Sequence, residues 1–171
     1  MSVERPAPRW TTFESADGCY RYQLARQISS RTALHAGMLN IIMLNPSTTT
    51  EQHNDPTIRR CVGYARAWGY GTLVVTNLFA LRSTAPGRLK LAVDPIGPDN
   101  NWHIHQVARE ANLLLAAWGV GGGYRGRDRS VLRIVSCFDV PLKCLGRTKG
   151  GYPFHPLYRR ASLQPVPFGV W

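Results

Sequence analysis

Short apolar runs recur along the chain, and each ends in a polar or glycine-rich turn. Four of them, at 39–44, 71–77, 112–119 and 140–146, are mostly apolar throughout. Such runs are too short for typical helices and favour parallel strands covered on both faces. A further run, at 19–26, alternates large apolar with polar side chains, which predicts a half-exposed strand at one edge of a sheet.

Stretches with helical spacing of apolar residues separate these runs. In the first, Asp55 occupies the position of a helix N-cap, Pro56 follows at the first helical position, and Gly69 can end the helix. Two more helices are expected, from 99 or 100 to about 111 and from 128 to 138. The core elements therefore follow one another as β-α-β-α-β-α-β.

This order predicts an α/β fold, a three-layer α/β/α sandwich around a mostly parallel sheet of about four core strands plus the edge strand. We expect a single domain over 20–160, a proline-rich and irregular N-terminal arm over 1–19, and a C-terminal tail over 161–171. The segment 82–98 is rich in proline and glycine and is expected to be a long surface loop with room for one turn of helix, whose role the sequence leaves open.

The charge of the chain points to a class of partner. It has 21 Lys and Arg against 10 Asp and Glu, a formal net charge of +11. Such an excess speeds association with polyanions and allows phosphates to be neutralised, so we expect a nucleic-acid partner. The alternative is a basic surface that is merely solvated.

Cysteine spacing and hydropathy indicate the redox state of the cysteines and the cellular location of the protein. The four cysteines lie far apart and show no C-x-x-C pair, which favours reduced thiols over a metal site or a disulfide scaffold. No long apolar span and no apolar leader are present, so we expect a cytoplasmic protein without a membrane partner. We expect a monomer that uses no metal and no cofactor.

Polar residues follow the predicted core strands where these strands end. Asn45 comes after the first, Asn77 ends the second, and His155 lies in the segment after the fourth. Because parallel strands all end at one edge of a sheet, these side chains are expected to converge there on one pocket. Each also has a structural interpretation: a turn at Asn45, a loop cap at Asn77 and a satisfied histidine at His155.

A series of short motifs spans roughly residues 20 to 160. They are, in order, Leu44-Asn45-Pro46-Ser47, Asp55-Pro56-Thr57-Ile58-Arg59-Arg60, Asn77-Leu78-Phe79-Ala80, Asp94-Pro95-Ile96-Gly97, Ala117-Trp118-Gly119, Cys144-Leu145-Gly146 with Thr148-Lys149-Gly150, and His155-Pro156-Leu157-Tyr158. By these motifs the chain resembles the bacterial and phage family catalogued as domain of unknown function 1643. Such a family supplies no mechanism.

Three of these motifs support a second, more distant resemblance. A motif with Asn45-Pro46 follows the first core strand, a strand ends in Asn77, and a motif with His155-Pro156 follows the last strand. This order is similar to that of the uracil-DNA glycosylase superfamily, whose fold is a parallel α/β/α sandwich. The chain departs from that pattern at Ser47, in place of a glycine, and at Leu157, in place of a serine.

The second resemblance implies an enzyme that flips a damaged or modified base out of DNA and hydrolyses its N-glycosidic bond. Asn45 would hold the attacking water and His155 would stabilise the departing base anion. Because an amide cannot accept a proton, a carboxylate must help, and Asp55 is the candidate. Its position as an N-cap is the alternative interpretation.

The base and its strand need contacts as well. Asn77 would read the edge of the flipped base, with Pro46 and Ser47 beside it. Basic and aromatic side chains in or beside the expected rim loops could neutralise phosphates or stack on bases. The candidates for nucleic-acid binding are Arg59, Arg60, Arg82, Arg147, Lys149 and Tyr158.

Two other functions remain open. One is a catalytically inactive nucleic-acid-binding module of the same fold, and the other is an enzyme that processes nucleotides or nucleosides. Residues 119–123 are glycine-rich but form neither a P-loop nor a dinucleotide fingerprint, and we expect a flexible turn at 121–123. For Arg125, Arg127 and Arg129, which follow that turn, a solvated basic face is the favoured interpretation.

Overall fold

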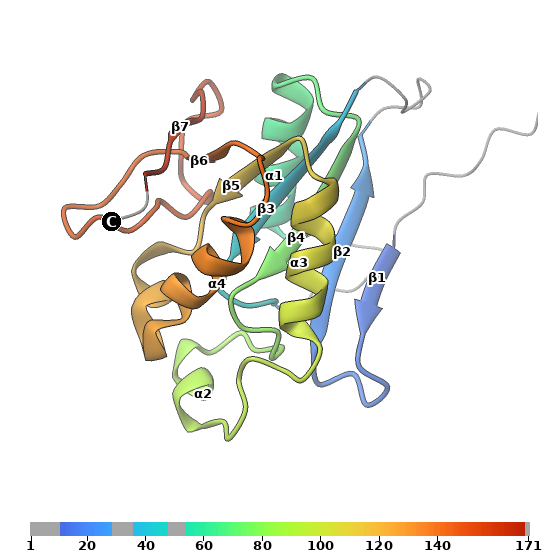
Figure 1. Cartoon of the computed structure of the whole chain (residues 1–171), viewed down its shortest axis with the longest axis vertical. Coiled ribbons are helices and arrows are strands. Elements are labelled where there is room, and N and C mark those ends of the chain that lie inside the picture. Colours follow the sequence, from blue (N-terminus) through green and yellow to red (C-terminus); the bar gives the residue numbers. More distant parts are fainter. Residues whose placement is uncertain (1–10, 29–35, 48–53, 170–171) are drawn as a thin grey trace, which may run out of the picture.

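A mixed α/β fold built around one sheet is seen in the computed structural model (Figure 1), which describes residues 11–28, 36–47 and 54–169. Within these ranges seven strands pair in the order β1-β2-β4-β3-β5-β6-β7. The strands are β1 (Thr11–Glu14), β2 (Arg21–Gln27), β3 (Met38–Met43), β4 (Thr72–Asn77), β5 (Leu113–Ala116), β6 (Leu142–Cys144) and β7 (Val166–Pro167).

The four central strands β4, β3, β5 and β6 are parallel, as their apolar composition predicts. Ile41 of β3 pairs with Val75 of β4 on one side and with Leu115 of β5 on the other. Strand β2 runs antiparallel to β4, β1 antiparallel to β2, and β7 antiparallel to β6. The parallel part of the sheet is thus bounded by antiparallel strands on both sides.

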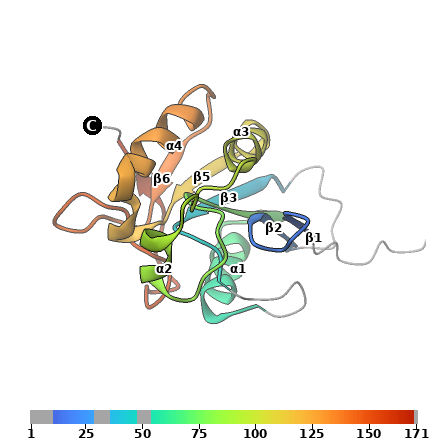
Figure 2. The same cartoon turned by 90° about the horizontal axis from the view of Figure 1, so that it is seen from below.

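Helices cover both faces of the sheet (Figure 2). Helix α1 lies on one face, while α3 and α4 lie on the other. The helices are α1 (Pro56–Ala67), α2 (Pro86–Leu91), α3 (Asn100–Glu110) and α4 (Arg127–Val135), with the 3-10 helix η1 (Gly119–Gly126) before α4. None of the helices in the described parts of the chain is long and apolar enough to cross a membrane.

Two apolar clusters hold these elements together. On the α1 face, Ile41 packs in one cluster with Tyr64 of that helix. On the opposite face, Ile42 shares a cluster with Ile104 of α3 and Val131 of α4. Alternate side chains of β3 therefore enter different cores, which explains why this strand is apolar at nearly every position.

The ends of α1 are those that the sequence predicts. Asp55 accepts a hydrogen bond from the backbone N–H of Ile58 at 2.7 Å, so it is the N-cap. Gly69 follows the helix with φ +81°, a left-handed conformation that glycine adopts at no steric cost. Local sequence signals thus determine both ends of this helix.

The sheet is larger than expected, and β2 is not at its edge. Strand β1 pairs outside it, within the segment 1–19 for which an irregular arm is expected, and β7 lies within the expected tail 161–171. The short helix α2 is the turn of helix for which the loop 82–98 has room, whereas residues 121–123, where a flexible turn is expected, lie in η1. These elements are short, and their periodicity is too brief to be recognised without their pairing partners.

The strand order creates a crevice. The connection from β3 leads through α1 on one face of the sheet, whereas the connection from β5 leads through η1 and α4 on the other. Neighbouring parallel strands whose connections leave on opposite faces have a gap between their carboxyl ends, where α/β proteins bind ligands. Here that gap lies between the residues after β3 and the residues after β5.

Candidate active site

Asn45, directly after β3, ties two loops together. Its side-chain amide nitrogen donates hydrogen bonds to the carbonyl oxygens of Ser83 at 2.8 Å and Pro46 at 3.2 Å. The backbone N–H of Ser83 in turn donates to the Pro46 carbonyl at 3.0 Å. The donor half of the Asn45 amide is thus engaged, while the Oδ1 atom has no partner among the described residues and can accept a hydrogen bond from water.

Asp55 is held on both sides of its carboxylate. Oδ1 accepts the N-cap bond from Ile58, and Oδ2 accepts a hydrogen bond from the hydroxyl of Ser47 at 2.8 Å. Ser47 belongs to the loop after β3, so this bond connects that loop to the start of α1. The carboxylate therefore has a defined position beside the loop that carries Asn45.

His155 is poised as a neutral hydrogen-bond donor. Its Nδ1 atom accepts a hydrogen bond from the backbone N–H of Leu157 at 3.2 Å, which requires the ring proton to lie on Nε2. Burial lowers the pKa of His155, the charge of Asp55 opposes that shift, and Arg159 adds to it. The His155 Cβ lies 3.9 Å from the place a Cβ on Gly119 would take, so the histidine stands at the end of β5.

The charge of Asp55 acts on a group of its own helix and on groups from two other parts of the fold. Burial lowers the pKa of Arg21 to about 10, with Arg82 acting in the same direction and Asp55 against it. Burial also raises the pKa of Cys61 to about 12, and Asp55 contributes to that shift. The charge of Asp55 therefore acts on Arg21, Cys61 and His155, in each case more weakly than burial does.

Asn77 ends β4 in register with Met43 of β3. Its side chain is only 3% exposed, and its Oδ1 atom is buried without a hydrogen-bond partner among the described residues. Its backbone carbonyl accepts a hydrogen bond from the Asn100 side chain at 3.0 Å. A buried amide oxygen without a partner is costly, so Asn77 carries an unused acceptor at the strand end.

Three of the residues expected to bind nucleic acid meet in one groove. Arg59 and Arg60 of α1 and Tyr158 after β6 line a cavity of about 440 Å³. Tyr158 is 89% exposed and has φ 65°, a backbone conformation that non-glycine residues rarely adopt. An exposed aromatic ring beside two arginines is suited to stacking on a base.

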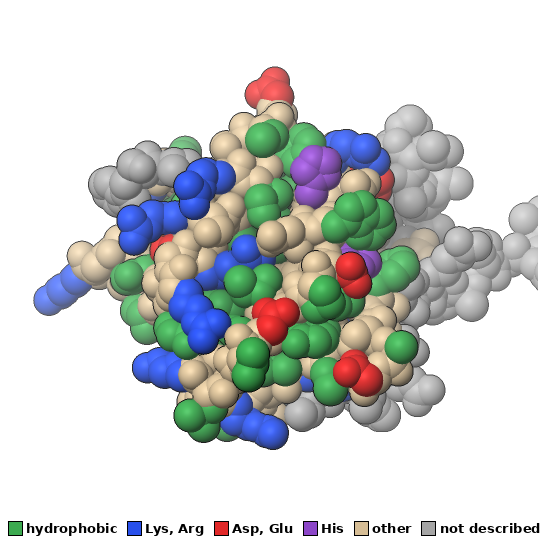
Figure 3. Space-filling view, turned by 60° about the horizontal axis from the view of Figure 1, so that its bottom comes forward, with side chains coloured by type: hydrophobic (Ala, Val, Ile, Leu, Met, Phe, Trp, Pro, Cys, Tyr) green, Lys and Arg blue, Asp and Glu red, His purple; other side chains and the backbone are tan. Residues whose placement is uncertain are grey.

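The other three lie elsewhere. Arg82 pairs with Glu14 at 2.9 Å, Arg147 stacks over the ring of Phe168 at 4.7 Å, and Lys149 is exposed in the loop after β6. The six residues therefore do not form one patch. Most of the Lys and Arg side chains visible in Figure 3 lie on the side that carries η1, α4 and the loops after β6.

Two buried arginines that the sequence does not single out lie beside this region. Arg21 and Arg26 of β2 are 3% and 2% exposed, and the Arg26 Nε donates to the Asn54 side chain at 2.9 Å, next to Asp55. In a strand with alternating apolar and polar residues, an arginine is expected to face solvent, and no sequence signal distinguishes a buried arginine from an exposed one. Arg127 is also buried rather than part of a solvated basic face, because its Nε donates to the Leu78 carbonyl at 2.6 Å.

No group of three or more His, Cys, Asp or Glu side chains in the described ranges could hold a metal ion. No curated protein and no solved structure matches the chain. One family model does, over residues 21–157, which is most of the chain and the part that contains the strand ends described above. The chain therefore belongs to the family described as "Protein of unknown function (DUF1643)".

Proposed function

We propose that the protein is a DNA glycosylase-like N-glycosidic hydrolase that flips a damaged or modified base of the uracil type and excises it. The observation that carries this proposal is the state of His155, whose Nδ1 is occupied as an acceptor and whose Nε2 bears the proton at the ligand-binding edge of the sheet. A neutral donor at this position can stabilise negative charge that develops on a leaving base.

The reaction breaks the bond between C1′ of the sugar and the base nitrogen, and the electron pair of that bond remains on the base. His155 donates a hydrogen bond from Nε2 to an oxygen of the base anion. Asn45 Oδ1 accepts a hydrogen bond from the water that attacks C1′. Asp55 favours the cation-like sugar through its charge and is the candidate acceptor of the water proton.

The fold and the charge support this assignment. Helices on both faces of a mainly parallel sheet, with Asn45, Asn77 and His155 following its strands, agree with a three-layer sandwich of the uracil-DNA glycosylase type. The net charge of +11 and the groove with Arg59, Arg60 and Tyr158 supply the phosphate and stacking contacts that a flipped strand needs.

The test is an excision assay. Purified protein is incubated with labelled oligonucleotides that carry uracil, hydroxymethyluracil, hypoxanthine or only normal bases, and abasic sites are then cleaved with alkali. We expect cleavage at a modified base, with a loss of at least about 100-fold in His155→Ala because a positioned donor or acid contributes roughly 10²–10⁴-fold. His105→Ala, which removes a histidine on α3, should excise at the wild-type rate.

Asn45→Ala should also reduce excision strongly, with Asn101→Ala, an exposed residue of α3, as its matched control. Because Asn45 also holds two loops, the thermal midpoint of each variant is measured beside its rate. Wild-type rates in folded His155→Ala and Asn45→Ala would refute the proposed site.

One observation favours a second function. Both oxygens of Asp55 already accept hydrogen bonds and the Asn77 amide is buried, as in a site that keeps its fold without its chemistry. The protein would then be an inactive nucleic-acid-binding module. Salt-dependent binding of the same oligonucleotides with no cleavage at any base would establish this alternative over the enzyme.

A further inference from the structure

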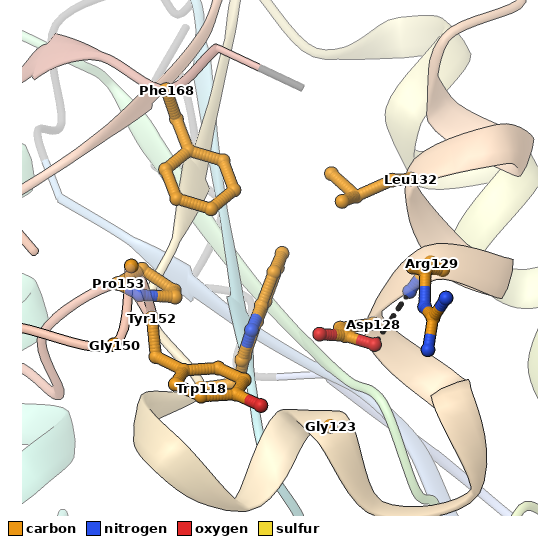
Figure 4. Close-up of a pocket in the computed structure, with 10 residues that line it drawn as sticks. Trp118, Gly123, Asp128, Arg129, Leu132, Gly150, Tyr152, Pro153 and Phe168 are labelled. Atoms are coloured by element: carbon orange, nitrogen blue, oxygen red, sulfur yellow. Dashed lines mark hydrogen bonds between the residues drawn. The ribbon is translucent and has the colours of Figure 1, made fainter. Parts of the chain in front are cut away.

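A separate cavity of about 280 Å³ lies between the end of β5, the loop after β6 and the start of α4 (Figure 4). Trp118 lines it and belongs to the apolar cluster on the α3 and α4 face of the sheet. Asp55 caps α1 on the opposite face. None of Asn45, Asp55 and His155 lines this cavity, which lies on the other face of the sheet from Asp55.

Aromatic rings form much of its wall. Trp118 and Phe168 are 2% and 6% exposed and meet edge to face, with ring centroids 5.7 Å apart. Figure 4 shows Tyr152 beside Trp118, on the same side of the cavity. Because both rings are almost fully buried, they form an apolar wall of the cavity against which a planar ligand can pack only at a small exposed part of each ring.

The glycine-rich segment makes room for these rings. A Cβ on Gly122 would lie 2.0 Å from the Trp118 Cδ1 atom, and a Cβ on Gly123 would lie 2.5 Å from the Tyr152 hydroxyl oxygen. Both distances are shorter than any real contact, so side chains at these positions would displace the two rings. The glycines thus shape a cavity, a role beyond that of a flexible turn.

One carboxylate faces the rings. The side chain of Asp128 points across the cavity towards Trp118 (Figure 4), and its Oδ1 accepts a hydrogen bond from the backbone N–H of Arg129 at 2.7 Å. It forms no ion pair with a described basic residue. Placement in the first turn of α4 stabilises its charge, and both oxygens keep lone pairs for donors on a ligand.

A basic groove adjoins this cavity. It has a volume of about 530 Å³ and shares Arg129 and Leu132 with the first cavity. Arg125 and Arg133 line it as well, and the three arginines are exposed and without an ion pair to any described acidic residue.

The spacing of two of these arginines favours an anion between them. Arg125 lies over the Tyr124 ring, 5.2 Å from its centroid. Arg129 and Arg133 are four residues apart on one helix, where like charges repel each other. A phosphate between them would convert this repulsion into attraction.

We propose that the cavity and the groove together bind a nucleotide with a guanine base. The base lies against Trp118 and Phe168, its N1–H and 2-amino group donate to the Asp128 carboxylate, and its phosphate lies among the arginines. Guanine is the base that presents two adjacent N–H donors, the edge that a carboxylate accepts in a paired geometry. The cavity lies just below the roughly 300–1,000 Å³ of pockets for drug-sized ligands, which suits a single base.

The proposal is tested by calorimetric titration of the full chain with guanosine 5′-monophosphate, guanosine and inosine 5′-monophosphate. We expect the guanosine monophosphate to bind more tightly than guanosine, by about tenfold at low salt, and to lose this advantage as salt screens the phosphate. The inosine nucleotide, which lacks the 2-amino group, should bind about tenfold more weakly than the guanosine nucleotide. Absence of binding at millimolar guanosine monophosphate would overturn the proposal.

Variants separate ligand binding from a structural role. Arg133→Gln should weaken binding of guanosine monophosphate several-fold and leave binding of guanosine unchanged. Arg66→Gln, which removes an exposed charge from α1, should change neither affinity. Asp128→Asn should abolish the preference for guanosine over inosine nucleotide, which a mere helix-end charge would not affect. The site would be refuted if Arg133→Gln and Arg66→Gln bound guanosine monophosphate equally well. It would also be refuted if Asp128→Asn still preferred the guanosine nucleotide to the inosine nucleotide.

The same titrations identify the source of the nucleotide. A guanine-containing trinucleotide either competes with guanosine monophosphate, which assigns the site to a strand, or fails to compete, which assigns it to the free nucleotide. Neither the titrations nor the Arg133→Gln variant involves His155, so this inference stands or falls independently of the excision assay.

Discussion

Asp55 is the residue at which a structural and a chemical role can be separated most sharply. In Asp55→Ala the backbone N–H of Ile58 and the hydroxyl of Ser47 both lose their acceptor. Loss of an N-cap costs about 0.5–2 kcal/mol, and loss of a typical hydrogen bond costs about 1 kcal/mol. We therefore expect the free energy of unfolding to fall by about 2 kcal/mol.

The matched control is Asp55→Asn. Asparagine is as good an N-cap as aspartate, so the bond to Ile58 persists and the free energy of unfolding should stay within about 0.5 kcal/mol of the wild-type value. The amide nitrogen takes the place of Oδ2, so the bond with the Ser47 hydroxyl can persist with its direction reversed, and the negative charge is removed. In the excision assay we expect Asp55→Asn to be folded and strongly impaired, because an amide cannot accept a proton.

Urea denaturation measures the first effect and the excision rate the second. For a chain of this size, about 2 kcal/mol corresponds to a fall of about 4–8 °C in the thermal midpoint. If Asp55→Ala were as stable as the wild type, the cap would contribute nothing and the reasoning would be wrong. If Asp55→Asn excised bases at the wild-type rate, Asp55 would be a structural cap alone.

Two further predictions concern packing and pH. Gly122→Ala should lower the free energy of unfolding by about 1–3 kcal/mol, because the new methyl group collides with Trp118. The control is Gly63→Ala in α1, where a methyl group meets nothing within 4 Å and should be neutral or stabilising. Equal stabilities of the two variants in thermal denaturation would contradict the close approach of Gly122 to Trp118. Burial lowers the pKa of His155 in the folded protein, so the unfolded chain takes up the proton first as the pH falls through about 6.5. The contribution of His155 to stability is therefore fully present above the pKa of the unfolded chain and is lost on acidification. Urea titrations at about pH 7.5 and 5.5 should show a smaller fall in the free energy of unfolding for His155→Gln than for the wild type. The same fall in both proteins would exclude His155 as its source.

The sequence alone determined the features that depend on neighbouring residues. The N-cap of α1 and its glycine stop are local hydrogen-bond and dihedral preferences, and Asp55 and Gly69 express them directly. The four parallel strands were equally visible, because burial on both faces removes polar residues from a strand such as β3. Family membership rests on the same kind of local motif.

The tertiary structure decided what depends on partners far apart in the chain. Strands β1 and β7 exist through their pairing with β2 and β6, and the order of the sheet, which sets the crevice, is not encoded in any single segment. Burial of an arginine such as Arg127 depends on the carbonyl of Leu78, just after a strand far away in the chain, and the cavity beside Trp118 is formed by several elements together. The periodicity of a sequence indicates which side of a helix or strand is apolar, but it does not determine which other element will cover that side.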